Sequence, residues 1–528
     1  MGPRLLGPRP LRAGASLSGG RSTAARRWPP QGGRLPEALW ALALGVAAAL
    51  GLAACGRDEP AGPRTPPPPP PRGTATDLSP ADPSEIPAVR RNVLLVCLDT
   101  LRADALAPWA AGAPLMPELS AEMARGVVFR NASSTAPWTA PSVASIVSGL
   151  LPSSHGVREL GSDPTLVPAV TTLAEVLGRY GWTTAACTGG GFVGPQRGML
   201  QGFQRTMVPF SFGGAADILL GNPLQMPGPE PWFLFLHTYE AHDPYDAVPA
   251  RPGFPPRRPP TLDFAAIDRE AEADGGRSLV RRFLVEPEVR GALFDTARGA
   301  ERMRIVIRYL EAGFREDPEG PALAREARAA YDRGLAKLDR AVAGYLREAG
   351  AKGLLRDTFV VIVSDHGEGF GEHGTLHHGR RLHEELVHVP MSIRGPGLPG
   401  RTIVDGSVST ADLLPTVLDL AGLPIPKGVE GRSLRPVIAG GPGRPVESEE
   451  RRTKFETGLP VDDDLLSVRD GRFTWIGVRD RKTGSVGEAH YDRAVDPGEV
   501  TPLAAGDSTS WPPAFLEAVR GARARLRK

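Results

Sequence analysis

Residues 357–388 read DTFVVIVSDHGEGFGEHGTLHHGRRLHEELVH and contain six of the ten histidines of this 528-residue chain. The segment begins with an apolar run, Phe359 to Val363, that is typical of a fully buried strand. Asp365 and His366 follow at the carboxyl end of that strand, where open α/β sheets bind ligands. A carboxylate beside an imidazole suits a divalent cation. Taken alone, the pattern equally fits a polar strand end beside a solvated, histidine-rich loop.

A second segment repeats this arrangement far away in the chain. Residues 90–106, RRNVLLVCLDTLRADAL, contain another buried-strand run that stops at Asp99. Two remote apolar strands therefore each deliver an acid at the carboxyl end. Convergence on one metal site explains both acids at once, so we expect Asp99, Asp365 and His366 to lie together.

A third segment, residues 134–157, supplies a candidate nucleophile. Its sequence is STAPWTAPSVASIVSGLLPSSHGV, and Thr139 lies just before Pro141, which suits the first turn of a helix. We predict a helix over 142–148 that ends at Gly149. A hydroxyl at the amino end of a helix faces free N–H groups and the positive end of the dipole, which favours an alkoxide and an incoming anionic ester. The alternative is that Thr139 only caps the helix.

These segments resemble the sulfatase family of the alkaline phosphatase superfamily. The similar pieces occur in the family's order: NVLLVCLDTLRAD, TAPWTAPSVASIVSGLLPSSHGV, FLFLHTYEAHDPY, TFVVIVSDHGEGFGEHGTLHHG and LHEELVHVPMSIRGPG. A later stretch, SVRDGRFTWIG to HYDRAVDPGE, is similar to the family's C-terminal subdomain. The resemblance implies an α/β fold with a central, mostly parallel sheet flanked by helices, a metal site at the sheet's carboxyl edge, and a small C-terminal α+β subdomain.

The chain departs from the sulfatase pattern at several positions. The family's formylglycine is made from a Cys or Ser, and here that position is Thr139, with Val143 at the position of the motif's Arg. Residues 183–194 lack the Lys and His that cradle sulfate, and the paired acids after the first strand are reduced to Asp99-Thr100. Threonine cannot become formylglycine by that route. It can act directly as an alkoxide, as it is understood to do in the related phosphodiesterases and phosphoglycerol transferases.

The resemblance implies a role for each matching residue. One divalent metal ion (Ca, Mn, Zn or Mg) is expected at Asp99, Thr139, Asp365 and His366, with Thr139 as the nucleophile. His378 is the candidate general acid at the leaving group, and His242 is expected to contact the substrate anion.

We therefore expect a metal-dependent hydrolase or transferase that acts on phosphate or sulfate esters, with phosphoesters favoured. Two alternatives stay open at this point. One is a sulfuric ester hydrolase that works without formylglycine, and the other is a non-catalytic binding lipoprotein with the same fold.

The other polar residues of these segments receive simpler predictions. His237 is interpreted as a satisfied core residue rather than a functional one, and His373 and His377 either bind a second metal or order the loop. Thr100 is a possible metal ligand, and Arg102 either pairs with a ligand carboxylate or the substrate, or lies on the surface. We predict that Asp104 caps a helix and that Glu368 is a solvated loop acid, and we predict structural or non-chemical roles for the remaining residues: His155, His383, His388, His490, Glu384 and Glu385.

Composition limits the class of partner. The formal net charge is +2, and the sequence has no basic stripe interleaved with aromatic residues, so nucleic acid is not an expected partner. The expected partner is an anionic ester substrate. Cys97 and Cys187 lie in apolar strand-like runs and are predicted to be small buried hydrophobes, with a disulfide between them disfavoured.

The amino-terminal residues 1–55 are predicted to be a leader and lipoprotein signal peptide. An apolar stretch follows Arg-rich sequence and closes with Leu52-Ala53-Ala54-Cys55, which resembles the lipobox of bacterial lipoproteins. Lipidation of Cys55 would attach the protein to the membrane of a bacterial cell envelope, on the periplasmic side or in the outer membrane. A plain membrane-spanning anchor is the alternative.

The rest of the chain divides by composition. Residues 56–88 are a Pro-rich linker, either a semi-rigid spacer or a leader remnant. Residues 89–440 are predicted to form the catalytic domain, because helical patterns at 117–125, 172–180 and 322–348 alternate with strand runs at 183–187, 232–237 and 358–363. Residues 246–320 read as an insertion that roofs the site, and 441–528 as the C-terminal subdomain of short strands and a last helix over 513–527.

Overall fold

The computed structural model describes residues 81–159, 164–208, 211–212, 231–245, 262–294, 296–452, 462–504 and 510–528. The predicted leader, lipoprotein signal and Cys55, together with residues 56–80 of the predicted linker, lie outside these ranges. Within them, no helix has both the length and the apolar character needed to span a membrane.

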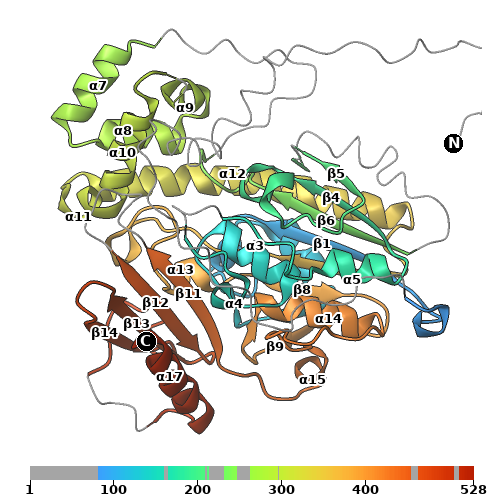
Figure 1. The fold of residues 1–528 in the computed structure, drawn as a ribbon. Coiled ribbons are helices and arrows are strands. Elements are labelled where there is room, and N and C mark those ends of the chain that lie inside the picture. Colours follow the sequence, from blue (N-terminus) through green and yellow to red (C-terminus); the bar gives the residue numbers. More distant parts are fainter. Residues whose placement is uncertain are drawn as a thin grey trace, which may run out of the picture. The chain divides into compact units, whose positions relative to one another are not determined.

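The centre of the protein is an eight-stranded sheet with the order β5-β4-β6-β1-β7-β8-β2-β9 (Figure 1). Neighbouring strands run parallel except where β8 meets β7 and β2. The predicted α/β class with a mostly parallel sheet is confirmed. In chain order the strands are β1 (Asn92–Leu98), β2 (Val127–Phe129), β4 (Thr183–Thr188), β5 (Arg205–Met207), β6 (Trp232–Thr238), β7 (Thr358–Val363), β8 (Met391–Arg394) and β9 (Thr402–Val404).

The two apolar runs identified in the sequence lie side by side in the middle of this sheet. In β1, alternate side chains enter opposite cores, with Leu94 and Val96 in one and Val93 and Leu95 in the other. Burial on both faces explains why the run is continuously apolar rather than alternating. Cys97 is level with Val363 of β7 and with His237 of β6, so the carboxyl ends of three strands meet at one edge of the sheet.

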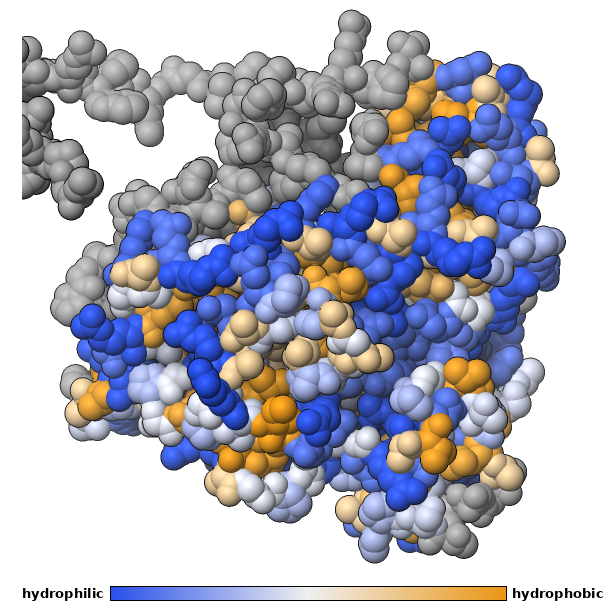
Figure 2. Space-filling view, turned by 180° about the vertical axis from the view of Figure 1, so that it is seen from behind, coloured by the Kyte–Doolittle hydropathy of each residue, from blue (hydrophilic) through white to orange (hydrophobic). Residues whose placement is uncertain are grey.

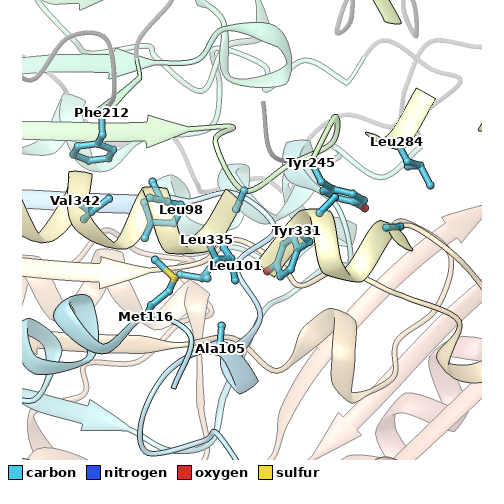
Figure 3. Close-up of a cluster of buried hydrophobic side chains, with 14 of the residues drawn as sticks. Leu98, Leu101, Ala105, Met116, Phe212, Tyr245, Leu284, Tyr331, Leu335 and Val342 are labelled. Atoms are coloured by element: carbon cyan, nitrogen blue, oxygen red, sulfur yellow. The ribbon is translucent and has the colours of Figure 1, made fainter. Parts of the chain in front are cut away.

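Helices cover both faces of the sheet (Figure 1). One core contains side chains of α2 (Pro117–Met123) and α12 (Gly320–Ala351). Figure 3 shows Leu335 and Val342 of α12 in this core, together with Met116, which directly precedes α2. The other contains side chains of α3 (Thr139–Ser148), α5 (Leu173–Arg179) and α14 (Leu413–Leu420). Shorter elements are β3 (Ala132–Ser133), α4 (Pro152–His155), α13 (Glu384–Val387), β10 (Val408–Ser409) and α15 (Arg435–Ile438).

The predicted insertion is helical where the structure describes it. It contains α7 (Phe264–Ala273), α8 (Arg277–Val285), α9 (Pro287–Phe294), α10 (Gly299–Arg308), a π-helical turn over Tyr309–Gly313 and α11 (Phe314–Glu316). Side chains of α8 belong to the same apolar core as α12, so these helices are joined to the main core rather than detached from it. Residues 246–261 lie outside the described ranges.

The C-terminal residues form an antiparallel sheet, which agrees with the predicted α+β subdomain. Its strands are β11 (Val446–Arg452), β12 (Asp463–Arg469), β13 (Phe473–Asp480) and β14 (Val486–Asp492). Helix α17 (Pro513–Leu526) packs against it through a separate core that includes Trp475 and Phe515. Strand β11 also contacts the main domain, because the Glu449 N–H donates to the Thr135 carbonyl at 2.8 Å.

Hydrophilic side chains cover most of the face shown in Figure 2, and apolar residues occur there in small separate groups. Cys97 and Cys187 are buried and unpaired, as predicted.

Candidate active site

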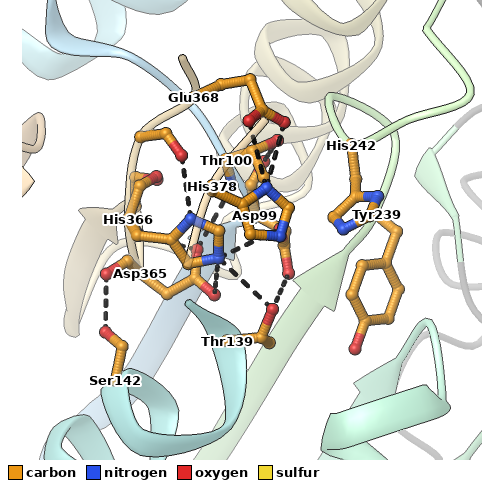
Figure 4. Close-up of polar contacts among 12 residues, drawn as sticks. Asp99, Thr100, Thr139, Ser142, Tyr239, His242, Asp365, His366, Glu368 and His378 are labelled. Atoms are coloured by element: carbon orange, nitrogen blue, oxygen red, sulfur yellow. Dashed lines mark hydrogen bonds and ion pairs between the residues drawn. The ribbon is translucent and has the colours of Figure 1, made fainter. Parts of the chain in front are cut away.

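Four side chains from three remote segments meet at the carboxyl edge of the sheet (Figure 4). Thr139 Oγ1 donates to Asp99 Oδ2 at 3.1 Å and lies 3.3 Å from His366 Nε2. The same His366 nitrogen is 3.7 Å from Asp99 Oδ1 and 3.6 Å from Asp365 Oδ2. All four side chains are buried. The residues predicted as one cluster are therefore one cluster in space.

Local structure explains how each side chain reaches this point. Asp99 follows β1 directly, and Asp365 follows β7 after one residue. Thr139 is the first residue of α3, which begins earlier than the predicted 142 and ends at Gly149, whose φ of 70° fits a glycine terminator. The hydroxyl of Ser142 in the first turn donates to the Asp365 carbonyl at 2.6 Å. This bond ties the nucleophile helix to the end of β7.

Thr139 does not serve as a helix cap. The N-cap residue of α3 is Trp138, which makes no side-chain capping bond. The Thr139 hydroxyl points instead to Asp99. The alternative interpretation of Thr139 as only a cap is therefore wrong.

The cluster fits a divalent cation. Asp99 Oδ1 and Asp365 Oδ2 are buried and have no hydrogen-bond partner within the described residues, which is costly unless a cation satisfies them. The Nδ1 of His366 lies 2.9 Å from the Gly367 carbonyl, so that nitrogen carries the proton and Nε2 keeps its lone pair. Ligand atoms of Asp99, Asp365 and His366 all lie within 4.8 Å of one another.

The electrostatics of the two acids differ. Burial opposes ionisation of Asp99, but its interactions with His237 and with the nearby His366 and His242 imidazoles outweigh this and lower its pKa. For Asp365, burial and the neighbouring Asp99 charge raise the pKa to about 6. A cation between two buried acids offsets the repulsion between their negative charges and stabilises both in the ionised form.

A group of imidazoles lies beside the acid cluster, by which we mean Asp99, Thr139, Asp365 and His366. The ring centroid of His378 is 4.6 Å from that of His366 and 4.9 Å from that of His242. His378 Nδ1 is 3.1 Å from both carboxylate oxygens of Glu368, and His242 Nδ1 is 2.7 Å from Asp243 Oδ1. Each imidazole is thus oriented by a buried carboxylate through one nitrogen, which leaves the other nitrogen for chemistry.

The pKa values of these two histidines shift in opposite directions. Burial disfavours the charge of His242, but the Asp243 carboxylate outweighs it and raises the pKa to about 10. Burial and the neighbouring histidines keep the pKa of His378 well below its usual value. The pair therefore presents one cationic and one neutral imidazole.

The prediction for Glu368 is wrong. Its side chain is fully buried rather than solvated, burial raises its pKa, and it holds His378. Asp243 was not identified from the sequence at all. Both acids lie within two residues of a site histidine, in His242-Asp243 and in His366-Gly367-Glu368, and that proximity is the signal that could have identified them.

Three further predictions near Asp99 are corrected. The Thr100 hydroxyl donates to the Asp99 carbonyl at 2.8 Å rather than facing the cluster, and its φ of 56° is unusual for a β-branched residue. Asp104 caps no helix and accepts from Arg102 at 2.7 Å. Arg102 is buried and also donates to the Glu368 carbonyl at 2.7 Å. It therefore braces the loop after β7.

The remaining histidines divide into two groups. His237 is not a satisfied core residue, because neither ring nitrogen has a hydrogen-bond partner within the described residues and Nε2 lies 3.5 Å from Asp99 Oδ2. His373 uses both nitrogens, at 3.0 Å from Glu385 Oε1 and 2.9 Å from the Glu499 carbonyl. It therefore orders the loop, whereas His377 lies within the group of candidate ligands His242, His377 and His378.

The histidines predicted to be structural lie outside these candidate ligand groups. His155 contacts Ser145 at 3.0 Å, and His388 contacts the Arg130 carbonyl at 2.7 Å. His383 stacks on His373, and His490 lies near Glu488.

Comparison with known proteins identifies the family. Residues 91–210 and 212–423 match the sulfatase family, and residues 371–505 match the family described as N-sulphoglucosamine sulphohydrolase, C-terminal. The first match covers more than half of the chain and contains all four residues of the acid cluster. The protein belongs to the sulfatase family of the alkaline phosphatase superfamily.

Individual relatives agree with this assignment. The chain is 32% identical to arylsulfatase K of Bos taurus over 164 residues, which cover 29% of this chain and 28% of that protein. It is 26% identical to choline-sulfatase of Rhizobium meliloti (strain 1021) over 485 residues, which cover 82% of this chain and 86% of that protein.

Solved structures with the same fold include the phosphonate monoester hydrolase of Agrobacterium radiobacter. It has a TM-score of 0.57 and 21% identity over 83% of this chain and 96% of that chain. A 2-O GAG sulfatase has a TM-score of 0.56 and 23% identity over 83% of this chain and 91% of that chain. At these identities the similarity establishes the fold.

Proposed function

We propose that the protein is a metal-dependent hydrolase or transferase of phosphoesters that uses Thr139 as its nucleophile. The observation that carries the proposal is the contact of the Thr139 hydroxyl with Asp99 and His366 at the amino end of α3. Asp99, Asp365 and His366 would hold a divalent cation, with Thr139 as a further ligand. Such a cation would polarise the ester oxygens and lower the pKa of the hydroxyl.

Side chains of Thr139, Asp99 and His378 would carry out the bond formation and the proton transfers. The Thr139 Oγ forms a bond to phosphorus as the bond to the leaving oxygen breaks, and the hydroxyl proton moves toward Asp99 Oδ2, which already accepts it at 3.1 Å. His378 is neutral in the free site, so it first takes up a proton from solvent at the ring nitrogen opposite its Glu368 contact, and the nearby anionic substrate favours this uptake. That proton then passes to the leaving oxygen. Water or an acceptor alcohol then attacks phosphorus as its proton passes to His378. The Thr139–phosphorus bond breaks, and the proton held by Asp99 returns to Thr139 Oγ.

His242 fits a substrate-binding role. Its raised pKa keeps the ring cationic at neutral pH, and Asp243 holds Nδ1, so Nε2 can donate to an anionic oxygen. This would replace part of the sulfate cradle that residues 183–194 lack.

Sulfate esters are the second candidate substrate class, because the relatives with the matching sequence are named as sulfatases. Threonine cannot supply a formylglycine, so this activity would also require direct attack by Thr139. The phosphoester proposal is preferred for that reason. A non-catalytic binding module is disfavoured by the intact acid cluster.

The test compares Thr139→Ala with Thr135→Ala, a buried threonine four residues upstream that is outside the acid cluster. Both are assayed on aryl phosphate mono- and diesters, phosphonates and aryl sulfates with Mn²⁺, Zn²⁺ or Ca²⁺. We expect Thr139→Ala to lose about 10⁴-fold or more in kcat, and Thr135→Ala to remain active. Mass spectrometry should find a phosphoryl group on Thr139 in the quenched wild type. Activity that survives in Thr139→Ala removes the nucleophile assignment, and turnover of sulfate esters alone replaces the phosphoester preference.

We also propose that Cys55 is lipidated and anchors the enzyme in a bacterial envelope, with its active site on the periplasmic side. The lipobox-like Leu52-Ala53-Ala54-Cys55 supports this. Labelled fatty acid should enter the wild type and not Cys55→Ser, and labelling that is equal in both would refute the proposal.

A further inference from the structure

One buried carboxylate joins three separate parts of the chain next to the site. Asp243 Oδ1 is 2.7 Å from His242 Nδ1 and 2.8 Å from His377 Nε2. The other oxygen forms an ion pair with Arg290 of α9. Asp243 therefore orients one imidazole from the loop after β6 and one from the loop after β7, and it is itself held by the insertion.

Arg290 is enclosed to an unusual degree for an arginine. It is 3% exposed, and its guanidinium lies over the Phe283 ring of α8 at 4.0 Å from the centroid. The Phe283 ring also lies beside His377, with centroids 6.2 Å apart. Taking a guanidinium out of water is costly, and an apolar side chain could fill the space with less loss. The burial of Arg290 is explained by its ion pair with Asp243.

We propose that Arg290 is a positioning residue, through which the insertion fixes Asp243 and thereby His242, the imidazole proposed to contact the substrate anion, together with its neighbour His377. This inference rests on the proposed function of His242. It gives the insertion a defined task, because α9 reaches the site through this ion pair.

The charges around Asp243 explain why loss of Arg290 should weaken anion binding. Asp243 interacts with one arginine and two imidazoles, all of them at least partly buried. Without Arg290, the carboxylate would lie in a low-dielectric site with only the imidazoles to compensate it, and both rings would be drawn toward Asp243. The acid cluster would be unaffected, since backbone pairing of β1 and β7 positions it. The expected defect is therefore in anion binding and not in metal content.

The insertion contains a matched control. Arg302 of α10 is also 3% exposed, pairs with Asp268 at 2.8 Å and lies 4.8 Å from the Phe264 ring centroid. Its partners belong to the insertion and not to the site. Arg302→Met therefore removes an equally buried, paired arginine from a neighbouring helix of the same insertion without touching Asp243.

The experiment uses the full metal-loaded chain and inorganic phosphate as the probe. We expect Arg290→Met to weaken phosphate affinity, and to raise KM, by about tenfold or more, with metal stoichiometry unchanged. Arg302→Met should bind phosphate within about twofold of wild type, even if its melting temperature falls as much as that of Arg290→Met. Arg290→Lys keeps the cation and should fall between wild type and Arg290→Met.

Equal phosphate affinity in the Arg290→Met and Arg302→Met variants would overturn the inference. Failure of the proposed function is distinguishable, because it would appear as activity in Thr139→Ala whatever the Arg290 variants do. If Arg290→Met does not fold, Arg290→Lys against Arg302→Lys gives the same comparison. Wild-type phosphate affinity in Arg290→Lys would then overturn the inference.

Discussion

The site has two halves that are built in different ways. The acid half, Asp99, Asp365 and His366, lies at the ends of adjacent parallel strands, whose ladder hydrogen bonds determine the spacing. The imidazole half, His242 and His378 with their neighbours, lies on loops and is held by pairs of side chains. Two loop histidines, His373 and His377, have positive φ angles of 53° and 77°. The difference teaches that the acid half is determined by topology and the imidazole half by side-chain contacts.

Asp365→Asn tests the acid half and should have the largest effect. It removes one ligand charge, so we expect metal content to fall and activity to drop by more than the roughly 100-fold that a supporting residue costs. Burial and the Asp99 charge raise the pKa of Asp365 to about 6, so its charge destabilises the metal-free fold at neutral pH. The variant without metal should therefore melt a few degrees higher, about 2–4 °C per kcal/mol gained.

Metal analysis and thermal melting with and without chelator check this prediction. Asp357→Asn is the control, since Asp357 precedes the same strand and pairs with Arg91 at the surface. Full metal content in Asp365→Asn would contradict the view that the acids share one cation.

Glu368→Gln tests the imidazole half. The amide still accepts from His378 Nδ1, but it no longer stabilises a charged ring, so we expect kcat to fall about 10- to 100-fold while metal content stays constant. Steady-state kinetics and metal analysis on the same sample measure both. Glu372→Gln is the matched control, because that acid lies on the same loop and contacts Arg102. Loss of metal in Glu368→Gln would erase the distinction between the halves.

His373→Gln tests the contact of the imidazole loop with the C-terminal region. Both ring nitrogens of His373 face acceptors, so both carry protons and the ring is cationic. Burial opposes this charge, but the bond to Glu385 raises the pKa of His373 above its ordinary value. This contribution is present at low pH and is lost as the pH rises through the raised pKa. Removing it should cost about 1.5–3 kcal/mol of stability and less activity than Glu368→Gln.

Denaturant unfolding at pH 6 and pH 9 checks the sign. The difference between wild type and His373→Gln should be larger at the lower pH. A difference that grows with pH would show that His373 is neutral in the fold.

His155→Asn gives the smallest expected effect on activity and examines the support of α3. His155 is buried against Ser145 of that helix, and burial lowers its pKa from 6.5 to about 3. Between these values the unfolded chain binds a proton that the native protein does not, so stability falls as the pH falls from 6.5 toward 3. The slope should reach about 1.4 kcal/mol per pH unit. Melting curves across this range should be flatter for His155→Asn, and equal slopes would remove His155 as the cause.

The sequence predicted the acid half well because its signals are local. A continuous apolar run of six or seven residues indicates a strand buried on both faces, and parallel strands place their carboxyl ends at one edge. The errors fall on residues whose environment is made by distant segments. Glu368 was predicted to be solvated, but it is buried. Arg102, which is remote in sequence, donates to its carbonyl, and His378 packs against its carboxylate.

The sequence by itself therefore determined the family, the order of strands and helices, and the meeting of Asp99, Thr139, Asp365 and His366. Periodicity and strand ends carry that information within short windows. Only the tertiary structure decided that Asp243 links two loops to Arg290, because such contacts join residues about 50 to 130 positions apart and depend on how helices of an insertion pack on α12. No local pattern of residues encodes that packing.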